Sequence, residues 1–260
     1  NVGLDVTVNN ALLACEYNAR ADIPVLAGSA KPLVRPVRSA SNIHGKSGLG
    51  ASLDLYANGT PSDKNGADFI IEMARKYTGK LEILSLGPLT DVALALEKAP
   101  EIAKAIACIT IMGGGVHAGN ATRYAEFTTG ADPEAASVVF SSGVKTVMIG
   151  LDATNLCYQP RSDIELLRAP TELGKIVPAM LSSYADVYKQ VHNIDGMMIH
   201  DAICAVYLWR PELFTCMKCR MTVCLEDGEH LGQTIPEDGD TCLAATSCDA
   251  QAVRNELLAV

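Results

Sequence analysis

Apolar and polar positions follow two periods along the chain, and these periods predict helices and strands in turn. Apolar residues every three or four positions are typical of amphipathic helices, whereas short continuous apolar runs are typical of strands buried on both faces. The helical pattern covers residues 4–20, 67–77, 89–98, 171–191 and 201–209, and further helices open at Asp132 and near Asp249. The predicted strands are residues 23–27, 80–86, 106–112, 144–151, 221–225 and 242–245.

Strands of this kind, joined by helices, predict an α/β fold with a mostly parallel open sheet flanked by helices, similar to a Rossmann fold. No repeat, low-complexity tract or linker interrupts the pattern, so we expect a single domain over residues 1–260. In open α/β sheets, ligands bind beyond the carboxyl ends of the strands. Leu86 ends a predicted strand, and residues 113–115 and Asp152 follow predicted strands; these are the first candidates for a site.

Composition narrows the classes of partner. The formal charge is −9 and the pI about 5.0, without a run of Lys and Arg, which disfavours nucleic acid and acidic membranes as partners. No apolar run approaches the roughly 20 residues that span a bilayer, and no secretory signal is visible. The nine cysteines sit mostly in apolar segments, so we expect buried thiols and a cytoplasmic protein. Cys216, Cys219 and Cys224 form a cluster, but no second ligand pair follows at zinc spacing.

Several loops carry polar residues with two possible uses. The glycines at 113–115 follow a strand, where the backbone either approaches a ligand closely or makes a tight turn. Asn120, Glu126 and Thr128 offer donors and acceptors for sugar hydroxyls, and the alternative is surface polarity with a helix cap.

Histidines and tyrosines form the second group of candidates. Asp201 precedes an apolar helix and could be its N-cap, while the adjacent His200 could protonate a leaving group near neutral pH. His44 is a second histidine in a polar loop. Tyr184 and Tyr188 are four positions apart and share one helix face, which fits either packing or a binding role.

These signals gain specificity from their order. Five motifs follow one another along the chain: Asn-Ile-His-Gly-Lys-Ser-Gly-Leu-Gly, Leu-Gly-Pro-Leu-Thr-Asp, Met-Gly-Gly-Gly-Val-His, Ala-Glu-Phe with Asp-Pro-Glu-Ala-Ala, and Ile-His-Asp. In this order and spacing the chain resembles the inosine-uridine preferring nucleoside hydrolase family over essentially its whole length. The motifs occupy residues 42–50, 86–91, 112–117, 125–136 and 199–201.

The resemblance implies the nucleoside hydrolase fold and hydrolysis of the N-glycosidic bond of ribonucleosides at one Ca²⁺. Water attacks C1′ of an oxocarbenium-like ribosyl centre, and the base departs. It further implies a small-molecule substrate and a homodimer or homotetramer. The implied metal ligands are Asp201 and the backbone carbonyl of Leu86. The implied sugar contacts are Asn1, Met112, Asn120, Glu126 and Thr128, where Thr128 replaces the more usual Asn. The residues implied near the base are His44, His200, Tyr184 and Tyr188, with His200 as the acid.

Two further expectations follow from the resemblance. The family's Asp-rich motif, which supplies the general base and further calcium ligands, is expected to precede Asn1, so that the N-terminal strand is missing from these 260 residues. The alternatives are a catalytically impaired nucleoside-binding relative and, more remotely, a structural domain without a ligand. Trp209 is the only tryptophan and falls in the predicted helix 201–209, which favours a pyrimidine or broad base preference over a purine-stacking one.

Overall fold

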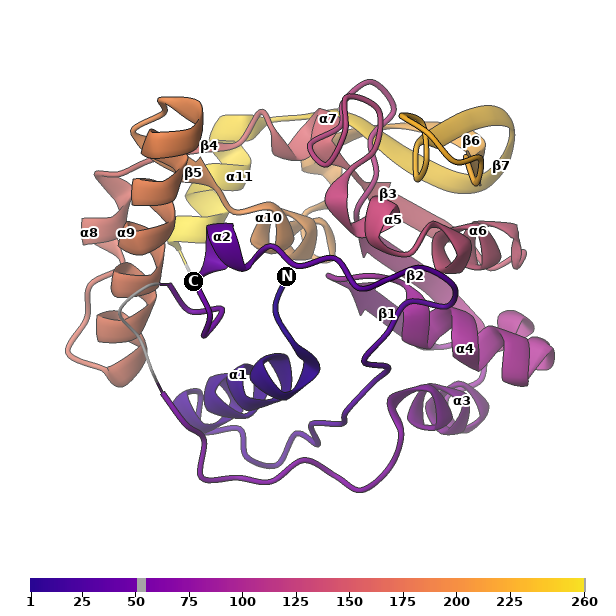
Figure 1. The fold of residues 1–260 in the computed structure, drawn as a ribbon, viewed down its shortest axis with the longest axis horizontal. Helices are drawn as coiled ribbons and strands as arrows, with labels where there is room; N and C mark the ends of the chain where they lie inside the picture. The colour runs from indigo at the N-terminus through magenta and orange to yellow at the C-terminus, as the bar shows by residue number, and fades with distance from the viewer. Residues whose placement is uncertain (51–54, 260) are drawn as a thin grey trace. The chain divides into compact units, whose positions relative to one another are not determined.

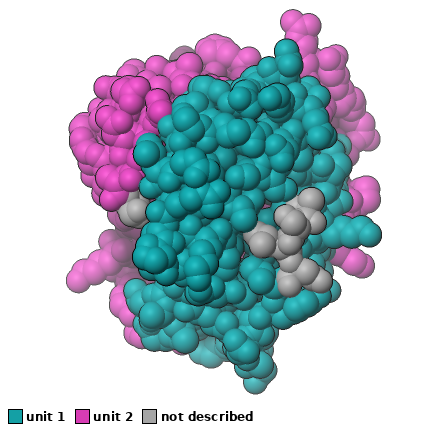
Figure 2. All heavy atoms as spheres, turned by 90° about the vertical axis from the view of Figure 1, so that its left-hand side faces the viewer, with its two compact units in different colours: residues 1–30, 38–66, 158–198 teal, residues 31–37, 67–157, 199–260 magenta. Residues whose placement is uncertain are grey.

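The computed structural model describes residues 1–50 and 55–259, and the chain divides into two compact units (Figure 2). The expectation of a single domain stays a prediction, and each unit is described by itself. Unit 1 comprises residues 1–30, 38–66 and 158–198, and unit 2 comprises residues 31–37, 67–157 and 199–260.

Unit 2 is built on a sheet with the strand order β1-β2-β3-β7-β6 (Figure 1). The first four strands of this order are parallel, and β6 pairs antiparallel with β7 at the edge. The mostly parallel sheet predicted from the apolar runs is therefore confirmed. The strands are β1 (Leu81–Ser85), β2 (Ile106–Met112), β3 (Thr146–Ile149), β6 (Phe214–Val223) and β7 (Thr234–Cys248).

Helices cover both faces of this sheet, because successive side chains of a strand point to opposite faces. Ile111 and Met148 belong to one apolar cluster, which is completed by α3, α4 and α6. Met112 and Ile149, their neighbours in sequence, belong to a second cluster with α7, α10 and α11. The helices of the unit are α3 (Gly66–Lys76), α4 (Thr90–Lys98), α5 (Phe127–Ala131), α6 (Pro133–Ser141), α7 (Leu151–Thr154), α10 (His200–Tyr207) and α11 (Ala250–Leu258), with 3-10 turns at Pro100–Lys104 and Pro211–Leu213.

Unit 1 contains a two-stranded antiparallel sheet and a long helix. The sheet pairs β4 (Tyr158–Pro160) with β5 (Gly196–Met198). Helix α9 (Glu172–His192) starts at Thr171, whose side chain accepts a hydrogen bond from the Gly174 amide. The other helices of the unit are α1 (Leu4–Tyr17), α2 (Ser41–His44) and α8 (Asp163–Leu166). Within the described ranges, no helix combines the length and apolarity required to cross a membrane.

Three local predictions are wrong. Residues 23–27 form no strand, and only Leu26 makes an isolated bridge, to Ser62; Pro24 lacks the N–H that a ladder needs. Strands β6 and β7 are much longer than residues 221–225 and 242–245, since their polar outer positions hide the strand pattern. Trp209 lies beyond the end of α10, is about half exposed and donates a hydrogen bond to Glu256.

Candidate active site

The glycine loop after β2 is held by side chains from distant parts of unit 2. The Gly114 amide donates to Oε2 of Glu126 at 3.0 Å. The Gly115 amide donates to the Thr234 hydroxyl at 3.0 Å, and that hydroxyl donates to the Gly115 carbonyl at 2.8 Å. The loop therefore has a defined conformation rather than that of an open turn.

Asp152 completes this support from the start of α7. Its two carboxylate oxygens accept hydrogen bonds from the amides of Val116 and His117, at 2.6 and 2.9 Å. Asp152 follows strand β3, as the sequence pattern indicates, but in the structure it binds the backbone of the neighbouring loop.

Gly114 is a position where glycine is required. Its φ is +71°, in the left-handed region that side chains disfavour. A Cβ built there would lie 2.8 Å from Sδ of Met148 and 2.9 Å from the Thr234 side chain. The loop thus approaches both the sheet and Thr234 too closely for any other residue.

Glu126 is a buried carboxylate at the N-terminus of α5. It is only 3% exposed, and its Oε2 accepts hydrogen bonds from the amides of Gly114, Thr128 and Thr129. Burial raises the pKa of Glu126, and the three amide donors act against that rise. The side chain caps the helix, as one of the alternatives predicts, and all three amide bonds use Oε2.

Asn120 and Thr128 lie close to Glu126 along the same loop. Asn120 is exposed, and its Oδ1 accepts a hydrogen bond from the Phe127 amide at 2.8 Å. Thr128 is buried, and its side chain hydrogen-bonds to Glu126. The hydroxyl at position 128 therefore supports the buried carboxylate.

Asp201 and His200 begin helix α10. The N-cap is Ile199, so Asp201 lies in the first turn and is not the capping residue. Solvent reaches Asp201, yet protein packs closely around it: burial, followed by the charge of Glu126, raises its pKa to about 6. The two carboxylates are thus close enough to repel each other, which favours a cation between them.

His200 is half-buried, and its ring is oriented by a helix of the same unit. Its Nδ1 lies 2.8 Å from the Thr154 hydroxyl at the end of α7. Burial lowers the pKa of His200 to about 4, so the ring is neutral at pH 7. A neutral imidazole that accepts at Nδ1 carries its proton on Nε2.

Met112 and Leu86 end neighbouring parallel strands. Met112 is the last residue of β2 and is 3% exposed, while Leu86 directly follows β1 and is 42% exposed. Both stand at the carboxyl edge of the sheet, where ligands of open α/β folds bind. Two of the predicted residues of unit 2 therefore share this edge of the sheet.

The remaining predicted residues belong to unit 1. His44 ends α2 and stacks on Tyr184 with ring centroids 5.5 Å apart and an angle of 16°. Tyr184 meets Tyr188 edge to face at 4.8 Å, and burial lowers the pKa of His44. The structure therefore assembles three of these four side chains into one aromatic cluster. The fourth residue, Asn1, accepts hydrogen bonds at its carbonyl from the Ala40 amide and the Ser39 hydroxyl.

The oxygen donors of unit 2 have the chemistry that calcium prefers. Asp201 is a carboxylate, and Leu86 offers a backbone carbonyl. Calcium takes roughly six to eight oxygen ligands, so these two groups would make only part of a shell. Across residues 1–50 and 55–259, no cluster of three or more His, Cys, Asp or Glu side chains is arranged to hold a metal.

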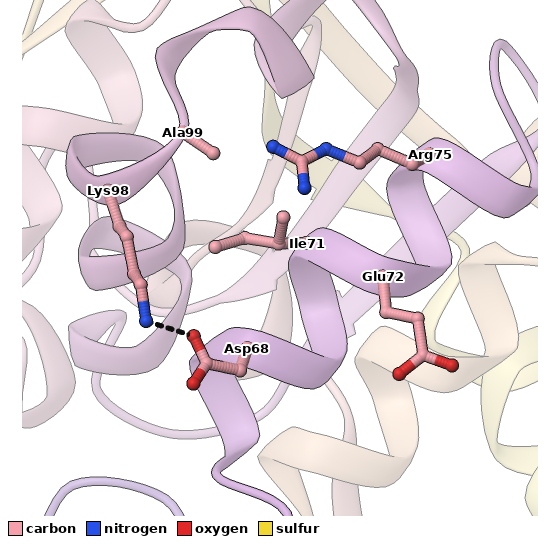
Figure 3. A pocket seen from close by; sticks show the side chains of 6 residues that line it. All are labelled: Asp68, Ile71, Glu72, Arg75, Lys98 and Ala99. Atoms are coloured by element: carbon pink, nitrogen blue, oxygen red, sulfur yellow. Dashed lines mark hydrogen bonds and ion pairs between the residues drawn. The ribbon is translucent and has the colours of Figure 1, made fainter.

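A cavity of about 440 Å³ lies elsewhere in unit 2, between α3 and α4 (Figure 3). Four of its six lining residues are charged, and the Lys98 ammonium points to Asp68, with which it forms an ion pair. No predicted site residue contributes to it. The cavity is lined by Asp68, Ile71, Glu72, Arg75, Lys98 and Ala99.

Two residues with a direct bearing on the site received no role from the sequence. Thr154 orients His200, and Thr234 binds both backbone groups of Gly115. Both threonines are fully or almost fully buried. From the sequence alone, such residues are indistinguishable from ordinary core residues. Their only signal is position: each lies at an end of an element that borders the carboxyl edge of the sheet.

The whole chain is similar to proteins of one family. A family model described as inosine-uridine preferring nucleoside hydrolase matches residues 1–255. The non-specific ribonucleoside hydrolase RihC of Escherichia coli is 36% identical over 244 residues, which cover 94% of this chain and 78% of RihC.

Solved structures agree with this assignment. A plant nucleoside hydrolase superposes with a TM-score of 0.92 at 30% identity, over 98% of this chain and 85% of that one. A purine-preferring ribonucleoside hydrolase from Gardnerella vaginalis gives a TM-score of 0.93 at 28% identity, over 99% of this chain and 87% of that one.

Proposed function

The chain belongs to the inosine-uridine preferring nucleoside hydrolase family and is a ribonucleoside hydrolase, and from that premise we propose that Glu126, Asp201 and His200 carry its chemistry. The observation that supports this assignment is the pair of mutually repelling carboxylates, Glu126 and Asp201, beside an oriented imidazole. Such a cluster is costly to the fold and is typical of sites where charge is needed.

The reaction breaks the bond between C1′ of ribose and the base nitrogen, and water adds at C1′. Positive charge develops on the ribosyl group as the base departs, and the negative Glu126 and Asp201 stabilise that charge. The side chains of Glu126 and Asn120 bind the ribose hydroxyls, with Met112 beside the sugar. Thr128 acts through Glu126, whose position it supports.

His200 assists the departure of the base. With the Thr154 hydroxyl donating to Nδ1, the ring carries its proton on Nε2, and this is the proton that the proposal offers to the leaving group. The neutral ring donates from Nε2–H to the base as negative charge accumulates there. This role does not depend on a positively charged imidazole, which agrees with the low pKa of His200.

We assign the calcium ion that the family resemblance implies to the carboxyl edge of the sheet. Asp201 and the Leu86 carbonyl are its proposed ligands in this chain, and further oxygen ligands complete the shell. When bound, the ion supplies positive charge that activates water for attack. It also offsets the repulsion between Asp201 and Glu126.

For the residues of unit 1, the proposal rests on the resemblance. Asn1 is assigned to the sugar, and His44, Tyr184 and Tyr188 to the base. The aromatic cluster supports a role in stacking, since planar bases bind well to aromatic rings. The similarity to a non-specific hydrolase supports a broad base preference, and the assembly expected from the resemblance is a homodimer or homotetramer.

The decisive experiment measures release of free ribose from inosine and uridine with calcium and after chelation. We expect turnover that chelation abolishes, and losses of roughly 100-fold or more in kcat/KM for Glu126→Gln and Asp201→Asn. Glu82→Gln and Asp238→Asn change exposed carboxylates and serve as matched controls. Equal activity of Asp201→Asn and Asp238→Asn would overturn the assignment. Nucleoside binding without ribose release would instead identify a catalytically impaired relative.

A further inference from the structure

Two cysteines that the proposed chemistry does not use lie in contact inside unit 2. Sγ of Cys157 and Sγ of Cys248 are 3.3 Å apart, although 91 positions separate them in sequence. Cys157 comes three residues after α7, and Cys248 is the last residue of β7. Both thiols face the carbonyl oxygen of Ala153, at 3.9 and 3.4 Å.

The two thiols differ in the properties that govern reactivity. Cys157 is 1% exposed, whereas Cys248 is only partly buried. The hydrogen bond between them lowers the pKa of Cys248 and raises that of Cys157. Cys248 is thus the thiol that a small oxidant reaches first and the one that forms a thiolate more readily. Cys157 is the more deeply buried thiol of the pair, so it reacts second.

A second thiol pair provides an internal comparison. Cys219 and Cys242 are register partners in the β6–β7 ladder. Each is 1% exposed, and burial raises the pKa of both thiols, for Cys242 to about 12. Neither is accessible as a nucleophile, so this pair lacks the asymmetry of Cys157 and Cys248.

We propose that Cys157 and Cys248 form a reversible disulfide site whose oxidant is a low-molecular-weight disulfide such as oxidised glutathione. The Cys248 thiolate attacks one sulfur of the oxidant, the S–S bond of the oxidant breaks, and one thiolate leaves. The Cys157 thiol then loses its proton to solvent and attacks Sγ of Cys248, expelling the second thiolate. Two protein thiols are oxidised by two electrons in total, and the oxidant is reduced to two thiols.

Little movement is needed to form the bond. A disulfide is about 2.05 Å long, so the sulfurs approach by about 1.2 Å. The bond ties the turn after α7 to the end of β7. Ala153 precedes Thr154, the residue that contacts His200, so the disulfide forms next to the turn that orients the imidazole. Closing so long a loop raises the midpoint of thermal unfolding, Tm, by several degrees.

The test equilibrates the full chain with oxidised glutathione, quenches free thiols by alkylation and maps the peptides. We expect the thiol count of the denatured protein to fall from nine to seven, the difference being Cys157 and Cys248, with a linked peptide pair and a higher Tm. Dithiothreitol restores nine thiols and the original Tm. Peptide mapping of the wild-type chain needs no variant and therefore does not depend on variant folding.

Variants separate the two steps of the reaction. Cys157→Ser traps glutathione on Cys248 as a mixed disulfide, whereas Cys248→Ser leaves Cys157 as a free thiol. Cys224→Ser, at another partly buried cysteine, still forms the bridge. Nine free thiols after treatment, a bridge between Cys219 and Cys242, or a Cys157→Ser variant that traps no glutathione would each overturn the proposal.

Discussion

The Thr154 hydroxyl lies 2.8 Å from Nδ1 of His200, and the threonine is completely buried at the end of α7. This contact fixes the rotation of a ring that a short helix carries in its first position. In the tautomer with a proton on Nε2, the Thr154 hydroxyl donates to Nδ1. The histidine and the threonine therefore act as one unit, although 46 positions separate them.

Replacing Thr154 by Val tests this relationship. The variant removes the hydroxyl and keeps the branched shape, so we expect kcat/KM for uridine to fall roughly tenfold or more through loss of leaving-group assistance. In a riboside with a nitrophenolate leaving group, the nitrophenolate departs without being protonated. The rate of hydrolysis of this substrate should therefore change little. Thr154→Ser restores the hydroxyl and should recover uridine hydrolysis. Equal losses on both substrates would indicate a purely structural role for Thr154.

Glu126 should show separable effects on stability and rate. Glu126→Ala removes the acceptor of three buried amides, so we expect a loss of about 2 kcal/mol or more in the free energy of unfolding. Glu126→Gln keeps an acceptor oxygen but loses the charge. It should stay closer to wild-type stability in urea denaturation while losing roughly 100-fold in kcat/KM. Wild-type activity in a folded Gln variant would contradict a role for the charge.

Gly114 should tolerate no side chain. Gly114→Ala places a Cβ 2.8 Å from Sδ of Met148 at a φ of +71°, and we expect a cost of about 2–4 kcal/mol in unfolding free energy. Gly79 has a φ of +72° but open space around a built Cβ. Gly79→Ala therefore carries only the backbone cost of about 1–2 kcal/mol. Chemical denaturation of both variants isolates the steric contribution, and equal costs would contradict the close approach at Gly114.

Calcium binding should depend on pH through Asp201. Burial and the charge of Glu126 raise the pKa of Asp201 to about 6, so below that pH a proton must leave before calcium binds. We expect the apparent Kd for calcium to be nearly constant above pH 7 and to rise about tenfold per pH unit below 6. Isothermal titration in two buffers of different ionisation enthalpy measures the released proton. A Kd that stays flat between pH 5 and 7 would exclude Asp201 as the coupled ligand.

Much of the fold follows from local patterns. The run at 106–112 becomes β2 with unchanged bounds, because it is apolar except for Thr110 and three glycines end it. Asp132 caps α6 as its place before Pro133 predicts. The extents of β6 and β7 could not be predicted in this way. Each lies in an edge hairpin where polar side chains face solvent, and only pairing between the two strands defines their length.

The residues of the candidate site likewise differ in how far the sequence could predict them. Glu126 and Asp201 are candidates because they belong to motifs whose order resembles the family, although each residue alone is also compatible with a helix cap. Thr154 and Thr234 could not be named in this way, since a threonine in such a segment is compatible with plain packing. Their contacts arise from tertiary packing, of α10 against α7 for Thr154 and of β7 beside the loop after β2 for Thr234, which brings residues 46 and 119 positions apart into hydrogen-bond distance. The sequence therefore indicates the charged candidates, whereas only the tertiary structure reveals the threonines that contact His200 and the glycine loop.

The support of the glycine loop has a consequence for how the molecule folds. Its amides bind Glu126, Asp152 and Thr234, which follow β2, follow β3 and begin β7, respectively. No isolated hairpin or helix pair can assemble these contacts, so the loop becomes ordered only when those strands have docked. The amide hydrogens of Gly114, Gly115 and Val116 should then exchange with solvent only through openings of the whole sheet. Their exchange rates would report the global stability of unit 2, even though they lie in a loop.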